Sequence, residues 1–322
     1  MKKLFIKLCK FFGFEIIDQN KFSSPTLNKE LNEDLSSFNK KSIILPLGEV
    51  KITRRVQSIL IIVRINTDIE IWDQNKKRLF EQPKIEYSIR SLNSLHKSIN
   101  FCKNKLPNLK IKTIIIDDHS SEENLSRIKK TIGKDFEIIS LNHKKFDEKI
   151  KRQKTRETFS NLASLLQSFE FGRENAEDLV FFIEDDYLHF DSMLSEMIES
   201  YERISSQIGK DIFMCPSDYP YLYMNSQKTN ILIGSRRHWR TVDQTLCTLM
   251  TSKNLFDKYW ENFEKTCEDR HNPFEKYINE IYQKEICISP LKSLSLHLTN
   301  INSSYGLAPF IDYEKLWDEN KI

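Results

Sequence analysis

Three consecutive carboxylates, Glu184, Asp185 and Asp186, directly follow the apolar run 179–183. An uninterrupted apolar run indicates a strand that is buried on both faces of a sheet. Mg²⁺ and Mn²⁺ prefer oxygen ligands, and proteins often hold them with one or two carboxylates plus substrate phosphates. The sequence therefore predicts a metal and phosphate site at the carboxyl end of this strand, where open α/β sheets bind their ligands. The competing interpretation is that the three acids cap a helix or lie in a solvated loop.

A second acidic pair, Asp117 and Asp118, follows another apolar run. Strand-like and helix-like patterns alternate through this half of the chain, which favours βαβ units and a largely parallel sheet. Right-handed crossovers would bring the carboxyl ends of all these strands, and both acidic clusters, to one edge. We expect strands at 58–63, 111–116, 136–141 and 179–183, and helices at 85–100, 122–132 and 159–171.

Composition narrows the class of protein. The chain has 322 residues and a formal net charge of +3, from 49 basic and 46 acidic side chains, which argues against a dedicated nucleic-acid binder. Glycine is scarce, at 7 residues, and neither GxGxxG nor GxxxxGK[ST] occurs. The six cysteines form no CxxC pair, so a zinc site is not expected, and reduced thiols in the cytoplasm are the plain interpretation.

The N-terminal segment differs from the rest. Residues 1–14 interleave lysine with leucine, isoleucine and phenylalanine, a pattern that suits either an interfacial helix on an anionic membrane or a helix docked on the protein's own core. We divide the chain into an extension, 1–55, with a polar linker at 18–41, and an α/β domain, 56–322. In the second half we expect helices at 193–208, 253–263 and 273–283 and strands at 211–215, 245–251 and 285–289.

The order of these features resembles a GT-A glycosyltransferase, over roughly residues 56–300. The resemblance rests on Asp117-Asp118 after the second strand and Glu184-Asp185-Asp186 after the fourth. The latter, followed by Tyr187-Leu188, is similar to the EDD form of the DXD motif in the N-acetylglucosaminyltransferase I branch, and family-two transferases share the plan. It implies an α/β fold of the nucleotide-diphospho-sugar transferase type, a Rossmann-like, mostly parallel sheet flanked by helices.

The resemblance also implies roles for the acids. By motif position, Asp186 would ligate a divalent metal, Mn²⁺ or Mg²⁺, directly, while Glu184 and Asp185 would contact the ribose or metal-bound waters. A histidine late in the chain often completes such a site, and His297 is the candidate. Its alternative is an ordinary core or surface histidine.

The remaining roles concern the nucleotide and the acceptor. Asp117 or Asp118 would accept hydrogen bonds from the base or ribose, and Arg64 would meet the base or the diphosphate. An inverting transferase also needs a carboxylate near the acceptor hydroxyl as general base. Arg240-Thr241-Val242-Asp243 looks similar to the branch pattern, with one residue inserted, and makes Asp243 that candidate. A helix or strand cap is its alternative.

The resemblance implies a metal-dependent, inverting transfer of a sugar, with N-acetylglucosamine and UDP as the expected donor parts. The acceptor would be a glycan or a lipid-linked sugar in surface polysaccharide synthesis, at the cytoplasmic face of a membrane. Two other functions stay open: a metal-dependent phosphohydrolase or phosphotransferase, and a non-catalytic sugar-nucleotide-binding domain. The phosphohydrolase or phosphotransferase is disfavoured, because enzymes of that kind, like receiver domains, place their acidic residues after the first strand. In this chain the acids follow the second and the fourth predicted strands.

Overall fold

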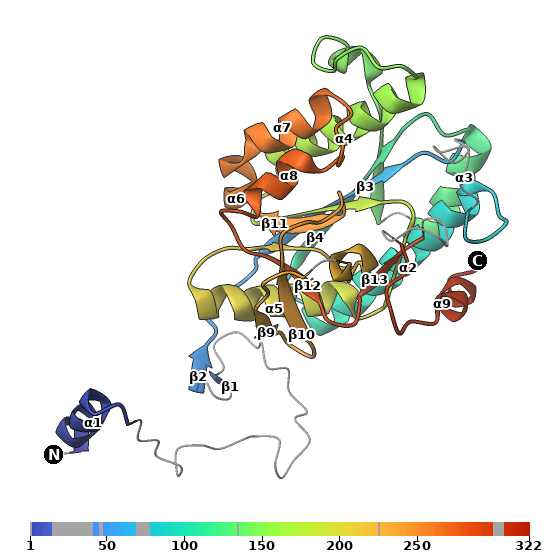
Figure 1. Ribbon diagram of the computed structural model, residues 1–322. Coiled ribbons are helices and arrows are strands. Elements are labelled where there is room, and N and C mark those ends of the chain that lie inside the picture. The colour runs from blue at the N-terminus through green and yellow to red at the C-terminus, as the bar shows by residue number, and fades with distance from the viewer. Residues whose placement is uncertain are drawn as a thin grey trace.

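The computed structural model describes residues 2–14, 41–44, 48–68, 78–133, 135–224, 226–298 and 306–322. A nine-stranded sheet forms its centre (Figure 1), in the order β5-β4-β3-β6-β11-β8-β12-β10-β9. Its first four strands in this order are all parallel to one another. They are β3 (Ser58–Ile65), β4 (Lys110–Asp117), β5 (Phe136–Ser140) and β6 (Leu179–Glu184).

The other half of the sheet is mixed. β11 runs antiparallel to β6, and β8 and β12 return to the direction of the parallel strands. β10 and β9 complete the edge as antiparallel neighbours. The bounds of these strands are β8 (Phe213–Met214), β9 (Ile231–Ile233), β10 (His238–Val242), β11 (Leu249–Ser252) and β12 (Cys287–Pro290).

Alternation along the buried strands separates two hydrophobic clusters. In β3, Leu60 and Ile62 pack with one cluster, whereas Ile59 and Ile61 pack with the other. The first cluster receives α4 (Arg156–Asn175), α6 (Lys253–Lys258), α7 (Trp260–Glu268) and α8 (Lys276–Ile281). The second receives α2 (Lys84–Lys105), α3 (Glu122–Ile132) and α5 (Met193–Ile208), so helices cover both faces of the sheet (Figure 1).

A small two-stranded sheet extends the edge that carries the acids. It pairs β7 (Tyr187–His189) with β13 (Ser295–His297), and packs on α9 (Tyr313–Glu319) through a third apolar cluster around Trp317. The remaining elements are α1 (Lys2–Phe11), β1 (Lys41–Ile44), β2 (Gly48–Lys51) and the 3-10 turns η2 (His143–Phe146) and η3 (Pro220–Tyr223). None of the helices in the described ranges has the length and apolar character needed to cross a membrane.

The fold class expected from the sequence, a mostly parallel sheet flanked by helices, is confirmed, and all four predicted parallel strands are present. Three local predictions were wrong. The helix over 253–263 is interrupted at Tyr259, whose φ of −109° and ψ of 23° separate α6 from α7. The helix over 273–283 is reduced to α8. The strand over 245–251 begins only at Leu249, because Thr245 bonds instead to Asn279 and Tyr282 beside α8.

The predicted division at residue 55 stays a prediction. All of the proposed polar linker except residue 41 lies outside the described residues.

Candidate functional site

The predicted acids gather where the order of the parallel strands changes direction. β3 lies between β4, the next strand along the chain, and β6, which follows later. In this register Arg64 stands opposite Glu184, and Ile65 stands opposite Asp117. Such a switch point leaves a crevice outside the carboxyl ends of the strands, which is the usual ligand site of an open α/β sheet.

Each acid of the triplet has its own basic partner. Glu184 pairs with Arg64 at 2.8 Å, Asp185 with Lys84 at 2.6 Å, and Asp186 contacts His297 at 3.3 Å. The three partners come from β3, α2 and β13, which are far apart in sequence. Three different neighbours within the chain therefore offset the charges of the three adjacent acids.

Arg64 and Glu184 form the innermost pair. The Arg64 guanidinium also donates to Asn161 Oδ1 at 3.0 Å and Ser164 Oγ at 3.2 Å, both on α4. Burial raises the pKa of Glu184, and the Arg64 charge opposes that rise without cancelling it. Arg64 thus neutralises Glu184 and ties β3 to α4, and its contact with a nucleotide stays a prediction.

Asp185 is turned toward the first turns of α2. Its carboxylate accepts from Lys84 Nζ at 2.6 Å and from Ser88 Oγ at 2.5 Å, and it lies 3.4 Å from the backbone nitrogen of Asn66. With these donors around it and little exposed surface, Asp185 joins the ends of β3 and β6 to α2. A direct contact with a ribose stays a prediction.

Asp186 is the acid that keeps a free oxygen. Its Oδ2 faces His297 Nε2, whereas Oδ1 is buried and accepts no hydrogen bond from the described residues. Burial alone would raise the pKa of Asp186, but His297 and the Lys84 charge hold it below its usual range. A buried, ionised carboxylate oxygen without a donor, beside an imidazole, is a donor set that fits the divalent cation implied by the family resemblance.

His297 is held in place by stacking. It stands opposite Tyr187 in the β7–β13 ladder, and the two rings are parallel within 7° at a centroid distance of 4.6 Å. The Tyr187 hydroxyl in turn bonds the Tyr219 hydroxyl at 2.9 Å. The structure therefore brings Asp186 and His297 together as the sequence predicted, and their role as metal ligands stays a prediction.

The second acidic pair lies one strand further from β6. Asp117 Oδ1 accepts from the backbone nitrogen of Ser120 at 3.2 Å, and burial raises the pKa of this carboxyl. Asp118 Oδ2 accepts from Asn66 Nδ2 at 2.9 Å and from Ser160 Oγ at 2.5 Å. Asn66 also approaches Asp185, so it connects the two acidic clusters that the sequence placed on one edge.

Asp243 lies elsewhere. It directly follows β10, where Val242 pairs with Cys287, the first residue of β12. Across the sheet, Cys287 pairs with Phe213 on β8, and Phe213 pairs with Thr251 on β11. Thr251 in turn pairs with Val180, which lies near the start of β6. Asp243 therefore belongs to the edge opposite Asp186, and among the described residues no hydrogen bond or ion pair joins it to the triplet. Its role as general base stays a prediction without support from position.

Sequence reasoning missed several members of the site. Lys84, Ser88 and His143 carried no motif signal, because only the fold brings α2 and η2 to this edge. Asn66 had a signal, since it belongs to the polar exit of the first predicted strand. Glu275 had none: burial and then the charge of Glu184 raise its pKa to about 7, and its Oε1 lies 3.8 Å from Cys247 Sγ.

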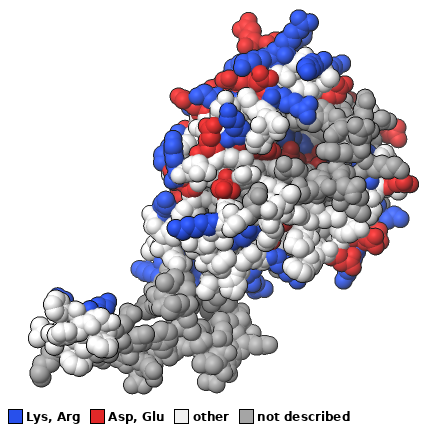
Figure 2. All heavy atoms as spheres, in the orientation of Figure 1, with Lys and Arg blue, Asp and Glu red and all other residues white. Residues whose placement is uncertain are grey.

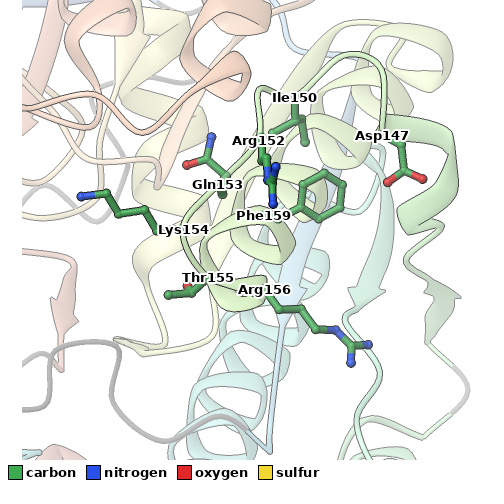
Figure 3. A pocket seen from close by; sticks show the side chains of 8 residues that line it. All are labelled: Asp147, Ile150, Arg152, Gln153, Lys154, Thr155, Arg156 and Phe159. Carbon is green, nitrogen blue, oxygen red and sulfur yellow. The ribbon is translucent and has the colours of Figure 1, made fainter.

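A pocket of about 390 Å³ adjoins this edge at the start of α4. Its lining includes the basic residues Arg152, Lys154 and Arg156 together with Phe159. In Figure 3, Lys154 and Arg156 point away in opposite directions, so these cations do not converge on one point. The pocket neighbours Ser160 and thus the Asp118 cluster, rather than the acidic triplet.

Comparison with known proteins gives distant likenesses only. No protein family and no curated protein matches the chain. Solved structures that resemble it include the galactosyltransferase LgtC in complex with donor and acceptor sugar analogs, at 11% identity, 70% coverage of each chain and a TM-score of 0.36. UDP-glucose pyrophosphorylase complexed with UDP-glucose has 10% identity, coverage of 82% of this chain and 97% of that one, and a TM-score of 0.37.

The inositol-1-phosphate CTP transferase from T. maritima has 12% identity, coverage of 83% and 97%, and a TM-score of 0.41. Because these scores are below 0.5, we draw neither activity nor ligand of this chain from them.

Proposed function

We propose that this chain is a metal-dependent glycosyltransferase that moves a sugar from a nucleotide diphosphate donor to an acceptor hydroxyl. One observation carries the proposal: Asp186, ionised and with one buried oxygen free, faces His297 at the carboxyl end of β6, beside the switch point of the sheet. A phosphate-bound cation suits that position. UDP and N-acetylglucosamine are the donor parts we propose, and they rest on the resemblance of Glu184-Asp185-Asp186 to the EDD branch.

Different residues of the site would have different roles in the proposed reaction. Asp186 and His297 would hold the cation, which, when bound, offsets the negative charge that develops on the departing diphosphate. Arg64 and Lys84 pair with Glu184 and Asp185 and fix their positions. Asp117 or Asp118, one strand away, would accept hydrogen bonds from the ribose or the base.

An inverting transfer needs a base that takes the proton of the acceptor hydroxyl as its oxygen bonds to the anomeric carbon and the bond to the diphosphate breaks. Asp243 is the candidate by sequence pattern. Glu275 is the candidate by position, because the charges of Glu184 and His297 act on it and its pKa of about 7 suits a base. Single-turnover transfer by Glu275→Gln and Asp243→Asn separates them, since only loss of the base removes transfer while donor binding persists.

Calorimetry with a panel of nucleoside diphosphates, with and without Mn²⁺, tests the donor site. We expect one diphosphate, UDP, to bind strongly only when the metal is present. If no nucleotide binds under any of these conditions, the transferase proposal is wrong. Phosphate release from a phosphate ester without any sugar nucleotide would support the phosphohydrolase instead, and donor binding without turnover would support a non-catalytic domain.

We also propose that α1 binds the surface of an anionic membrane, on which the acceptor would be a lipid-linked glycan. Its large apolar side chains are exposed, from 55% for Leu8 to 84% for Phe11, and Figure 2 shows this segment as mostly uncharged with lysines on one part of it. Apolar burial in the interface and about 1 kcal/mol per lysine near anionic lipid would drive binding. The exposed apolar residues of this segment are Leu4, Phe5, Leu8, Phe11, Phe12 and Phe14.

Vesicle sedimentation tests this surface. The full chain should sediment with vesicles that contain phosphatidylserine and much less with phosphatidylcholine alone, and deletion of residues 1–14 should abolish the difference. Leu8→Glu with Phe11→Glu should do the same, whereas Lys97→Glu, on α2, should not. Equal sedimentation of the full and the shortened chain would contradict membrane binding by α1.

A further inference from the structure

Two histidines and a carboxylate meet outside the acidic triplet. Asp118 follows β4, His119 is the next residue, and His143 begins η2 after the neighbouring strand β5. One oxygen, Asp118 Oδ1, lies 3.3 Å from His119 Nδ1 and 3.1 Å from His143 Nε2. The three potential ligand atoms lie within 4.8 Å of one another. In the described part of the chain, no other cluster of three such groups is this tight.

The geometry of this cluster matches a metal site. In a tetrahedral site with bonds of about 2.0–2.1 Å, neighbouring ligand atoms are about 3.4 Å apart. The two distances from Asp118 Oδ1 are close to that value. The imidazole rings stack at 4.6 Å with 11° between their planes, so one ring must turn before both in-plane lone pairs meet at a single ion. His119 has a side chain that is 54% exposed, which leaves it room to turn.

Neighbouring donors orient the carboxylate. Asn66 Nδ2 and Ser160 Oγ both donate to Asp118 Oδ2, which leaves Oδ1 to face the imidazoles. Partners of this kind fix the direction of a metal ligand and raise metal affinity. His119 is 54% exposed on its side chain, so an ion can enter from solvent and keep an open coordination position.

We propose that Asp118, His119 and His143 bind a borderline divalent ion of the zinc and cobalt type, at a site separate from Asp186 and His297. Two imidazoles with one carboxylate favour such ions. The sites share no ligand, and they belong to strands on either side of β3, about 10 Å apart across the sheet. The ion would join the loop after β4 to the turn after β5.

Hydrogen bonds within the cluster give the competing interpretation. His143 Nε2 lies 2.7 Å from Ser160 Oγ, and that hydroxyl donates to Asp118 Oδ2. The same groups without metal form only hydrogen bonds and ion pairs.

Calorimetry with Zn²⁺ and absorption spectroscopy with Co²⁺, both on the full chain without nucleotide, test the proposal. We expect one tight site and Co²⁺ bands of a low-coordinate site. His143→Ala and His119→Ala should each weaken Zn²⁺ binding at least about 10-fold. His238→Ala, an exposed histidine elsewhere, and Asp186→Asn should leave it unchanged.

Circular dichroism of each variant verifies that the fold is retained, and His143→Gln serves as a second variant if His143→Ala does not fold. Absence of a tight Zn²⁺ site, or a site that survives loss of both histidines, would overturn the proposal. Because no nucleotide is present, this result is independent of the proposed transferase activity.

Discussion

Tyr187 and His297 face each other across the β7–β13 ladder with stacked rings, and this contact fixes the imidazole beside Asp186. Tyr187 follows the acidic triplet directly, so the same short segment supplies an acid and the support for its partner. The support is itself anchored, since Tyr187 is fully buried and bonds Tyr219. Tyr187 is in this sense a positioning residue.

Replacement of Tyr187 by leucine should therefore loosen His297 without removing a ligand. We expect Tyr187→Leu to weaken Mn²⁺ binding about 10-fold, as loss of a supporting partner does in metal sites. Tyr187→Phe keeps the ring and loses only the hydroxyl, so it should retain most of the affinity. Mn²⁺ binding followed by electron paramagnetic resonance measures both. Equal losses in the two variants would show that the hydroxyl, and not the stacking, holds His297.

Asp186→Asn should remove the charged oxygen on which the proposed cation site depends. We expect Mn²⁺-dependent UDP binding to fall by at least about 100-fold, because a direct ligand contributes more than the partners that orient it. Asp191→Asn is the matched control, since Asp191 is exposed and five residues later in the chain. Unchanged Mn²⁺-dependent UDP binding in Asp186→Asn would rule out Asp186 as a ligand.

Arg64→Leu should destabilise the fold, because it leaves Glu184 partly buried without its partner. We expect a loss of about 3 kcal/mol in the free energy of unfolding, at the low end for breaking a buried pair, since the Glu184 side chain is 29% exposed. Adding Glu184→Gln should restore part of the loss. Urea denaturation measures each variant, and additive losses in the double variant would contradict a direct coupling.

Gly172→Ala tests the packing behind the acidic strand. At an ordinary helix position this change stabilises by about 1 kcal/mol. Here a Cβ would lie 2.9 Å from Phe182 Cζ and 3.2 Å from Val180 Cγ2, both on β6. We therefore expect the opposite sign, a loss of about 1–3 kcal/mol from overpacking, measured by urea denaturation. Phe182→Leu in the same chain should relieve part of it, and a stabilised single variant would show that β6 can shift.

Glu275 should make stability depend on pH. Its pKa is raised from 4.5 to about 7 in the fold, so between these values the folded chain binds a proton that the unfolded chain has released. The free energy of unfolding therefore falls as pH rises through this window, by at most about 1.4 kcal/mol per pH unit for one group.

Glu275→Gln removes that contribution. In thermal unfolding measured from pH 4.5 to 8, the stability of the variant relative to the natural chain should therefore increase as pH rises. Glu202 has a similarly raised pKa, but it is present in both proteins and cancels in the comparison. Parallel stability curves would mean that Glu275 titrates normally in the folded chain.

Local patterns determined the parallel half of the sheet. The apolar runs of β3 and β6 are buried throughout, and both end in polar residues at the carboxyl edge. β4 and β5 are more exposed and include Lys112 and Glu137, but their apolar residues were sufficient to predict strands. Parallel pairing alone was sufficient to predict that the acids at the carboxyl ends of these strands, Asp117, Asp118 and Glu184 to Asp186, lie at one edge of the sheet. The mixed half was less predictable, since its strands have two to five residues, and their pairing partners are distant in sequence.

The sequence by itself determined which acids stand at the edge of the sheet, whereas His297 was a candidate partner of Asp186 that only the family resemblance implied. Only the tertiary structure decided how each acid is neutralised, because Arg64, Lys84 and His297 approach from three elements whose packing no local pattern encodes. It also separated Asp243 from the acids and brought Glu275 and His143 toward them. Short motifs specify the ends of strands, whereas the contacts across them depend on how helices and loops fold over the sheet.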